Sequence, residues 1–381
     1  MTVASARIFL SAGEPSGDLH GAAVVRALRE RLPHAALDAF GGPRMAEAGA
    51  TVLFPMEGFA AFGIVEVIEK IPAHYLLLRR MERAFSRNGY DLVILIDYPG
   101  FHLHVAEAAH RAGIPVLYYI APQLWAWRPE RAKRLAAACD RLAVILPFEE
   151  TFFRRVGVTA DYVGHPLLDR GAPPTRAAAR ASLGIGAGER VLALFPGSRA
   201  GEIKRLWPSQ RDAALTLLDR GIATRVLVAA TDHGGHAAGD AVRYPGSERF
   251  TLVRADSQAV LAAADAGIVK SGTSTLEAAL SDTPMVVPYK VNAITAFLTR
   301  RLVTVKWASL VNLIADREVV PEFLQEALSA ERLVNAVAPL LNASDPATVA
   351  QRAGLALVRE RLGTPGAAGR VADIAMALLA A

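Results

Sequence analysis

Two short glycine turns, one in each half of the chain, carry side chains that could do chemistry. The first is Gly-Glu-Pro-Ser-Gly-Asp at 13–18, after the apolar run 8–10, and the second is Pro-Gly-Ser-Arg at 196–199, after the apolar run 191–195. A strand that passes through a glycine turn into a helix leaves backbone N–H groups unpaired, and these can hold a phosphate. Two such units predict a cleft between two nucleotide-binding domains.

The first turn offers Glu14, Ser16 and Asp18 beside Gly17, at the carboxyl end of a predicted strand. Ligands of open α/β sheets bind at that end, which makes these four residues candidate binding residues. The alternative is plain capping of the next helix by Ser16 or Asp18. The turn lacks the Gly-x-Gly-x-x-Gly spacing of a dinucleotide site, which disfavours a nicotinamide cofactor.

Asp97 lies at the exit of the most hydrophobic strand of the first half, Leu-Ile-Asp-Tyr-Pro at 95–99. A carboxylate in such a place is costly unless it is used or paired. Facing a cleft, it can accept a proton from a hydroxyl nucleophile as a general base. A turn aspartate that bonds backbone N–H groups before the proline is the alternative.

The second half predicts a diphosphate site. The Arg199 guanidinium can pair bidentately with a phosphate, and a second small-residue turn leads into a helix at 271–275. Glu277 lies one turn into that helix, where a carboxylate can accept two ribose hydroxyls. Simple helix capping is the alternative for each turn. The predicted site comprises Ser198, Arg199, Ser271, Gly272, Thr273, Ser274, Thr275 and Glu277.

Two further features could line the cleft. The loop 121–128 holds two tryptophans, an amide and an arginine, which favours a pocket containing Trp127, although a plug at a domain interface is an equal alternative. His165, in Gly-His-Pro at 164–166, precedes a predicted linker and is expected at the cleft floor, with a structural histidine as the alternative.

Composition excludes several classes of protein. Cys139 is the single cysteine, so there is no intramolecular disulfide or multi-cysteine metal site. The histidines and acidic residues show no metal-binding spacing, and no Gly-x-Ser-x-Gly nucleophile turn occurs. We expect no metal and no cofactor. The balance of 42 Lys+Arg against 37 Asp+Glu fits anionic partners, but no nucleic-acid motif accompanies it.

The elements that must position these residues alternate between strand and helix, which predicts α/β architecture with two doubly wound Rossmann-like domains facing a cleft. A chain of 381 residues fits two domains. The stretch 170–175, with Gly and paired Pro, is the clearest linker. We expect domains at 1–170 and 171–355, and a C-terminal helix at 356–381 that packs on the first domain or on a partner subunit. Strands are expected at 8–12, 36–40, 92–96, 115–120, 141–146, 190–195, 224–229, 250–253, 266–269 and 284–288.

Ten motifs occur in the order seen in lipid-A-disaccharide synthases, and from about 8 to 325 the chain resembles that family. The motifs are Glu-Pro-Ser-Gly-Asp at 14–18, Gly-Pro-Arg-Met at 42–45, Gly-Ile-Val-Glu-Val at 63–67, Ile-Asp-Tyr-Pro at 96–99, Pro-Gln-Leu-Trp-Ala-Trp-Arg at 122–128, Leu-Pro-Phe-Glu at 146–149, Gly-His-Pro at 164–166, Pro-Gly-Ser-Arg at 196–199, Ser-Gly-Thr at 271–273 and Asn-Leu-Ile-Ala at 312–315.

The resemblance implies a glycosyltransferase-B fold with an acceptor-binding first domain and a UDP-sugar-binding second domain. It also implies transfer of 2,3-diacylglucosamine from UDP-2,3-diacylglucosamine to the 6-hydroxyl of 2,3-diacylglucosamine 1-phosphate, called lipid X, with inversion. Asp97 matches the family's proposed base. Arg199, the turn 271–275 and Glu277 would hold UDP, while Glu14, Ser16, Asp18 and Asn312 would line the sugar cleft. Family members often carry Asp and Asn where this chain has Gly100 and His102, which affects contacts near Asp97.

A segment from Phe59 to Arg80 combines many apolar residues with three basic ones, which is typical of an interfacial helix. An ordinary core helix with a solvated basic end is the alternative. Both implied substrates carry acyl chains, so the resemblance favours a cytoplasmic protein bound peripherally to the inner leaflet of the inner membrane, with a homodimer as one arrangement. No apolar run is long enough to span a bilayer, and no signal peptide is recognised. Leu77→Glu is expected to weaken membrane association without unfolding the protein.

Two rival functions remain open on the sequence. A UDP-N-acetylglucosamine 2-epimerase, or another UDP-sugar enzyme, would use the same turns but would not need the apolar segment. A non-catalytic nucleotide-sugar binding protein would not need Asp97 at a strand end.

Overall fold

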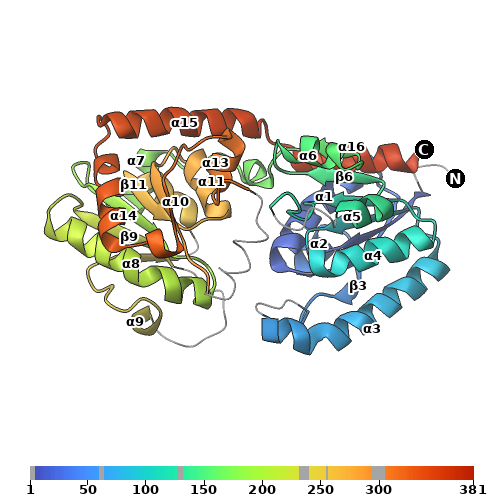
Figure 1. Cartoon of the computed structure of the whole chain (residues 1–381). Coiled ribbons are helices and arrows are strands. Elements are labelled where there is room, and N and C mark those ends of the chain that lie inside the picture. Colours follow the sequence, from blue (N-terminus) through green and yellow to red (C-terminus); the bar gives the residue numbers. More distant parts are fainter. Residues whose placement is uncertain (1–4, 60–63, 127–131, 231–239, 255, 293–304) are drawn as a thin grey trace. The chain divides into compact units, whose positions relative to one another are not determined.

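A computed structural model describes residues 5–59, 64–126, 132–230, 240–254, 256–292 and 305–381, with the backbone alone at 64–68, 88, 240 and 241 (Figure 1). The chain divides into two compact units. Unit 1 comprises Met1–Arg170 and Thr364–Ala381, and unit 2 comprises Gly171–Gly363. No helix of the described residues is long and apolar enough to cross a membrane.

Unit 1 is built on one parallel sheet in the order β3-β2-β1-β4-β5-β6-β7. After β3, at one edge of the sheet, the chain crosses to the other side of β1. Strands β1 and β4 are therefore neighbours although two strands separate them in sequence. This is a doubly wound topology, as expected. The strands are β1 (Arg7–Ser11), β2 (Ala36–Gly41), β3 (Thr51–Pro55), β4 (Leu92–Ile96), β5 (Val116–Tyr119), β6 (Arg141–Val144) and β7 (Ala160–Tyr162).

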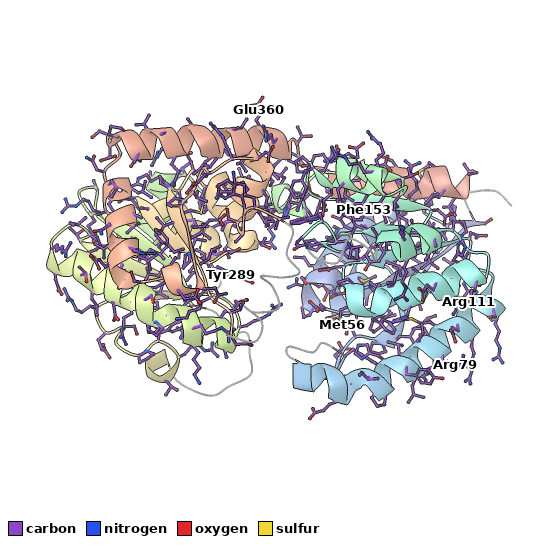
Figure 2. The ribbon with its side chains drawn as sticks, viewed as in Figure 1. Met56, Arg79, Arg111, Phe153, Tyr289 and Glu360 are labelled. Atoms are coloured by element: carbon purple, nitrogen blue, oxygen red, sulfur yellow. The ribbon has the colours of Figure 1, made fainter. Side chains whose placement is uncertain are left out.

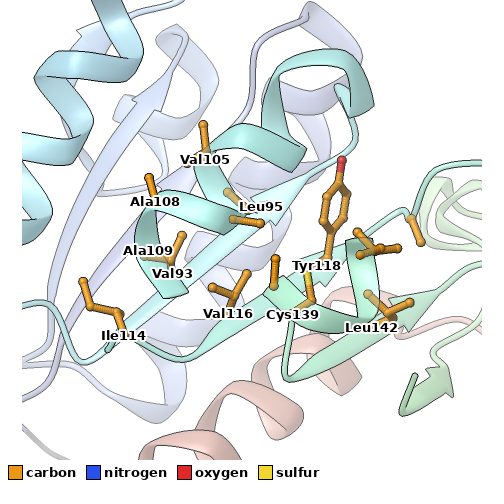
Figure 3. Packing of buried hydrophobic residues seen from close by; sticks show 14 of the residues in the cluster. Val93, Leu95, Val105, Ala108, Ala109, Ile114, Val116, Tyr118, Cys139 and Leu142 are labelled. Atoms are coloured by element: carbon orange, nitrogen blue, oxygen red, sulfur yellow. The ribbon is translucent and has the colours of Figure 1, made fainter. Parts of the chain in front are cut away.

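Helices cover both faces of this sheet, so its central strands are apolar throughout. Successive side chains of β4 enter opposite cores: Leu92, Ile94 and Ile96 pack in one, and Val93 and Leu95 in the other. Figure 3 shows the core that contains Val93 and Leu95. The helices are α1 (Pro15–Arg31), α2 (Pro43–Glu47), α3 (Ile64–Asn88), α4 (Pro99–Arg111), α5 (Ala132–Ala138), α6 (Glu149–Arg155), the 3-10 helix η3 (Pro166–Arg170) and α16 (Ala367–Leu379).

Unit 2 repeats the plan, with a parallel sheet in the order β10-β9-β8-β11-β12-β13. Its strands are β8 (Val191–Phe195), β9 (Arg225–Ala230), β10 (Thr251–Arg254), β11 (Ala266–Val269), β12 (Met285–Tyr289) and β13 (Glu322–Leu324). Its helices are α7 (Arg176–Ser182), α8 (Ala200–Asp219), α9 (Asp240–Arg243), α10 (Ser257–Ala263), α11 (Thr273–Leu280), α13 (Leu310–Ala315), α14 (Ala330–Val337) and α15 (Pro346–Leu362), with 3-10 turns η4 (Gln325–Ala327) and η5 (Pro339–Leu341).

The expected strands are present within two residues at each end, but three short strands are additional. These are β3, β7 and β13, which occupy sheet edges. Each is at most five residues long and only partly buried. A short edge strand buries too little to need the continuous apolar run that identifies a central strand.

The C-terminal segment differs from the expected helix at 356–381. Helix α15 runs unbroken to Leu362 within unit 2, and Gly363, at φ 72°, ends it. The return to unit 1 therefore begins at Thr364. Helix α16 packs against α1 of the same chain, where Arg31 and Asp373 form an ion pair of 2.7 Å.

Candidate functional site

The first glycine turn and Asp97 meet where β1 and β4 lie side by side. In open α/β sheets this switch in strand order, at the carboxyl ends, is where ligands bind. The turn packs on the end of β4: a Cβ added at Gly13 would overlap the ring of Tyr98, whereas one at Gly17 would lie 3.3 Å from the Ala12 Cβ and at an ordinary contact distance of 3.6 Å from the Ile96 carbonyl oxygen. Glycine at these positions brings Glu14 and Ser16 to the edge of the sheet that holds Asp97.

Asp97 comes directly after β4 with a backbone in the left-handed region, at φ 52°, and Tyr98 follows at φ 56°. Burial raises the pKa of the Asp97 carboxyl above its ordinary value, and a hydrogen bond from the Tyr98 backbone opposes the rise. Such a bond also fits the alternative role of Asp97, a turn aspartate that bonds backbone N–H groups. Within the described residues no cation pairs with the carboxylate. It is therefore a desolvated carboxyl group at a strand end with no cation beside it among the described residues.

Asp18, a predicted binding residue, is engaged by the backbone of unit 1. It is 2% exposed, and its carboxylate accepts hydrogen bonds from the backbone N–H groups of Gly42 at 2.8 Å and of Arg44 and Met45 at 3.1 Å. It therefore caps the start of α2. Neither Asp18 nor Ser16 caps α1, because that helix begins at Pro15, after Glu14. Ser16 is exposed at the first turn of α1 and Glu14 is half-buried.

The aromatic loop is anchored by a residue that sequence reasoning missed. The Trp125 Nε1–H donates to Glu149 at 2.8 Å, and the same carboxylate accepts the backbone N–H groups of Ile145 and Leu146. Burial raises the pKa of Glu149 to about 7. Trp125 itself is buried, at 7% exposed. Trp127 lies outside the described residues.

His165 is a structural histidine, the alternative that the sequence left open. It is 6% exposed, and its Nδ1 accepts the Leu167 backbone N–H at 3.2 Å, at the start of η3. Burial lowers its pKa to about 4, helped by nearby His20 and Arg170, so the ring is neutral at pH 7.

In unit 2 the Gly197 turn is already occupied by a carboxylate of the chain itself. Glu202 accepts the backbone N–H groups of Ser198 at 3.2 Å and Arg199 at 3.5 Å. These are the amides predicted to hold a phosphate. Arg199 is exposed, with its guanidinium 4.0 Å from Glu202. This turn can offer a phosphate the Arg199 side chain but not these two amides while Glu202 stays in place.

The second turn of unit 2 is better suited to an anion. Gly272, at φ 137°, precedes α11, whose first amides, those of Thr273 and Ser274, have no acceptor within the helix. Two hydroxyls of the predicted site bond the turn itself: Ser271 donates to the Ala308 carbonyl at 2.6 Å, and Thr275 donates to the Gly272 carbonyl at 2.8 Å. Ser271 and Thr275 shape the turn, while Thr273 is exposed and Ser274 half-buried.

Lys270 adds a cation to this turn, and the sequence prediction did not include it. It follows β11, and its Nζ lies 3.4 Å from Glu202 and 3.1 Å from the place where a Cβ on Gly272 would stand. Strands β8 and β11 are neighbours, so Arg199, Lys270 and the start of α11 occur at one edge of the sheet. The sequence did contain a signal for it, since a lysine stands between an apolar strand and a Ser-Gly-Thr turn. Glu277 is half-buried one turn into α11.

Asn312, which the resemblance assigns to the sugar cleft, is buried and has hydrogen-bond partners at both ends of its side-chain amide. Its amide nitrogen donates to the Val320 carbonyl and to Glu322, both at 2.8 Å, and its oxygen accepts the backbone N–H groups of Val319 and Val320. It fastens α13 to the segment that leads into β13. No group of three His, Cys, Asp or Glu side chains in the described part of the chain could hold a metal ion.

Nearly the whole chain is similar in sequence to one family of known proteins. The family model described as lipid-A-disaccharide synthetase matches residues 8–363. The lipid-A-disaccharide synthase of Geobacter sulfurreducens is 42% identical over 379 residues, covering 98% of each chain.

Solved structures share the fold at low sequence identity. A putative UDP-N-acetylglucosamine 2-epimerase from Listeria monocytogenes has a TM-score of 0.63 at 12% identity, covering 98% of this chain and 95% of that one. Sucrose-phosphate synthase from Thermosynechococcus elongatus has a TM-score of 0.60 at 16% identity, covering 98% and 99%. At such identities these likenesses report the fold alone.

Proposed function

The chain belongs to the lipid-A-disaccharide synthase family of glycosyltransferases, and on that basis we propose which of its residues carry the reaction. The expected glycosyltransferase-B fold is confirmed by its structural neighbours. The donor is proposed to be UDP-2,3-diacylglucosamine and the acceptor 2,3-diacylglucosamine 1-phosphate. Unit 1 is proposed to bind the acceptor and unit 2 the donor.

Asp97 is the proposed general base, and its environment is the observation that carries this assignment. The carboxylate would take the proton of the acceptor 6-hydroxyl as that oxygen attacks the anomeric carbon of the donor. The carbon–oxygen bond to UDP breaks on the opposite face, so the configuration inverts and a β-1,6 linkage forms. Desolvation and the absence of a pairing cation within the described residues support this role, because both raise the proton affinity of the carboxylate.

Loss of UDP places growing negative charge on the diphosphate, and unit 2 offers groups to stabilise it. Lys270, Arg199 and the first amides of α11 would receive that charge as fixed donors. Glu277 is proposed to accept the ribose hydroxyls, and Thr273 and Ser274 to contact the phosphates. Ser198 is also proposed to belong to the donor site, because its side chain is exposed. In unit 1, Glu14, Ser16 and Gly17 are proposed to border the acceptor.

The test is release of UDP from UDP-2,3-diacylglucosamine in EDTA, with and without 2,3-diacylglucosamine 1-phosphate. We expect release that requires the acceptor and persists in EDTA, together with a disaccharide product. Equal release without acceptor would instead support the epimerase or hydrolytic alternative. The epimerase retains only a likeness of fold, and family membership disfavours it.

Helix α3 is proposed to bind the membrane surface through its outer face. Ile71, Tyr75 and Leu76 are 56%, 59% and 64% exposed. Arg79 and Arg80 are exposed on the same helix, with Arg79 in an ion pair of 2.9 Å with Glu82 (Figure 2). An exposed apolar patch with basic neighbours suits an anionic lipid surface. Leu77, chosen from the sequence for substitution, is instead 4% exposed in the core, so Leu77→Glu is expected to unfold unit 1.

The variant that tests membrane binding is therefore Ile71→Glu combined with Leu76→Glu. Removing two apolar contacts and adding two negative charges should lower the fraction that pellets with anionic liposomes by about tenfold or more. The thermal midpoint should change little, because both side chains are exposed. Val349→Glu is the matched control, since Val349 is 57% exposed on α15 of unit 2. Equal pelleting of the double variant and the wild type would reject α3 as the contact.

A further inference from the structure

His102 is a fully buried histidine beside Asp97 that the proposed reaction does not use. It lies in the first turn of α4 and is 0% exposed. The rings of Tyr98, Phe101 and Tyr118 surround it. Its two ring nitrogens are both engaged: Nδ1 is 2.6 Å from the Asp97 carbonyl oxygen, and Nε2 is 2.8 Å from Ser11 Oγ.

The partners of His102 fix its tautomer. A backbone carbonyl can only accept, so Nδ1 must carry the proton and donate it to Asp97. Burial lowers the pKa of His102 to about 3, so the ring is neutral and Nε2 is an acceptor. The Ser11 hydroxyl therefore donates to Nε2. The result is a chain of hydrogen bonds from β1, through the ring, to the backbone of Asp97.

The Asp97 carbonyl receives a second hydrogen bond, from the Tyr118 hydroxyl of β5 at 2.8 Å. Two buried donors thus hold one carbonyl oxygen. This carbonyl belongs to the planar peptide that links Asp97 to Tyr98. Holding its oxygen from two sides consequently fixes the Asp97 backbone, and with it the point from which the carboxylate side chain extends.

This peptide needs such support, because Asp97 and Tyr98 are consecutive non-glycine residues in the left-handed region. That conformation is disfavoured for side chains with a Cβ, above all for a bulky one. Strained backbones of this kind persist where their surroundings determine them.

We propose that His102 and Tyr118 are positioning residues, which hold the Asp97–Tyr98 peptide so that the Asp97 carboxylate faces the acceptor hydroxyl. The inference rests on the proposed role of Asp97 as base. An asparagine Nδ2 can replace the Nδ1–H donor toward the Asp97 carbonyl, although it is too short to reach Ser11 as well.

The first test compares His102→Leu with His102→Asn. Leucine removes the donor, so kcat should fall by about 10- to 100-fold while KM for both substrates stays within about twofold, because only the base is misplaced. Asparagine should restore most of kcat. Folding is checked by circular dichroism, and a folded His102→Leu variant with wild-type kcat would overturn the proposal.

Tyr118→Phe gives an independent test that does not depend on His102→Leu folding. It removes the second donor and should lower kcat about tenfold at unchanged KM. Tyr90→Phe is the matched control, since Tyr90 is also buried in unit 1 and donates to Asp38 at 2.8 Å, away from Asp97. Equal kcat for both tyrosine variants would overturn the proposal.

Asp97→Asn, measured in the same assay, distinguishes failure of the proposed base from failure of the proposed positioning residues. If that variant is inactive while the His102 and Tyr118 variants have normal kcat, the positioning role fails and the base stands. If Asp97→Asn turns over normally, the base assignment itself fails, and the positioning role with it.

Discussion

Asp97→Asn is expected to lower kcat by about 10² to 10⁴-fold while leaving the enzyme folded and more stable than the wild type. The rate falls because an amide cannot take the proton of the acceptor hydroxyl, and general-base catalysis is worth about that factor. The stability rises because the variant no longer buries a desolvated carboxylate that no described cation pairs with. A residue that only closed a turn would lose stability on substitution rather than gain it.

The sign of the pH dependence follows from the raised pKa of Asp97. The folded state holds this proton more tightly than the unfolded state, so the carboxyl favours folding at acid pH. That contribution is lost as pH rises through the folded pKa. The amide introduced by Asp97→Asn does not titrate, so the stabilising effect of this substitution should be larger at pH 7 to 8 than near pH 4. Urea denaturation at the two pH values measures the difference.

The pH dependence of kcat/KM gives a second measure of the pKa of the Asp97 carboxyl. A base must be deprotonated, so kcat/KM should fall at acid pH, with an apparent pKa above the usual aspartate value of about 3.9. Asp316→Asn is the matched control, because Asp316 shares the left-handed backbone, at φ 51°, but is exposed in unit 2. Wild-type kcat in Asp97→Asn, or equal losses in the two variants, would exclude Asp97 as the base.

The sequence predicted the places of the site better than the roles of its residues. Strands such as β4, buried at every position, and turns such as Gly13–Gly17 are local signals, because strand, turn and helix are consecutive. Their topology then brings β1 beside β4 and β8 beside β11. The doubly wound pattern and the two switch points therefore follow from periodicity and connection rules.

Roles depend on the partners of each side chain, and the sequence did not predict the hydrogen-bond partners of Asp18 and Asn312. Asp18 looked like a ligand residue because the amides it caps begin 24 residues later, at Gly42. Asn312 is engaged by Val319 and Val320, backbone groups that carry no signal in their residue types. His102 was noticed only as a departure from the family pattern, since its link to Ser11 spans 91 residues.

Helix α3 shows a different limit. Its apolar residues form two faces, an inner one with Leu77, Met81 and Phe85 and an outer one with Tyr75 and Leu76. Both faces are apolar, so periodicity alone does not say which one meets the core. Contacts with the rest of unit 1 decide that Leu77 is inside and Leu76 outside.

Lys270→Met is expected to raise KM for the UDP-sugar about 10- to 100-fold with a smaller fall in kcat. A charge-assisted hydrogen bond to a phosphate is worth about 1.5 to 3 kcal/mol, which corresponds to that range. The variant also leaves Glu202 without the lysine 3.4 Å away, so its negative charge would oppose an incoming diphosphate. Both effects weaken donor binding and neither touches Asp97.

Three variants measured together make the Lys270 prediction specific. Lys204→Met removes a lysine that is exposed on α8, and KM should stay at the wild-type value. Lys270→Arg keeps the charge and should recover part of the affinity. Combining Lys270→Met with Glu202→Gln should recover part of it too, because the negative charge that Lys270 no longer offsets is then removed. If Lys270→Met binds UDP as the wild type does in calorimetry, the diphosphate does not use this lysine, and Arg199 with the start of α11 must hold it without a cation from β11.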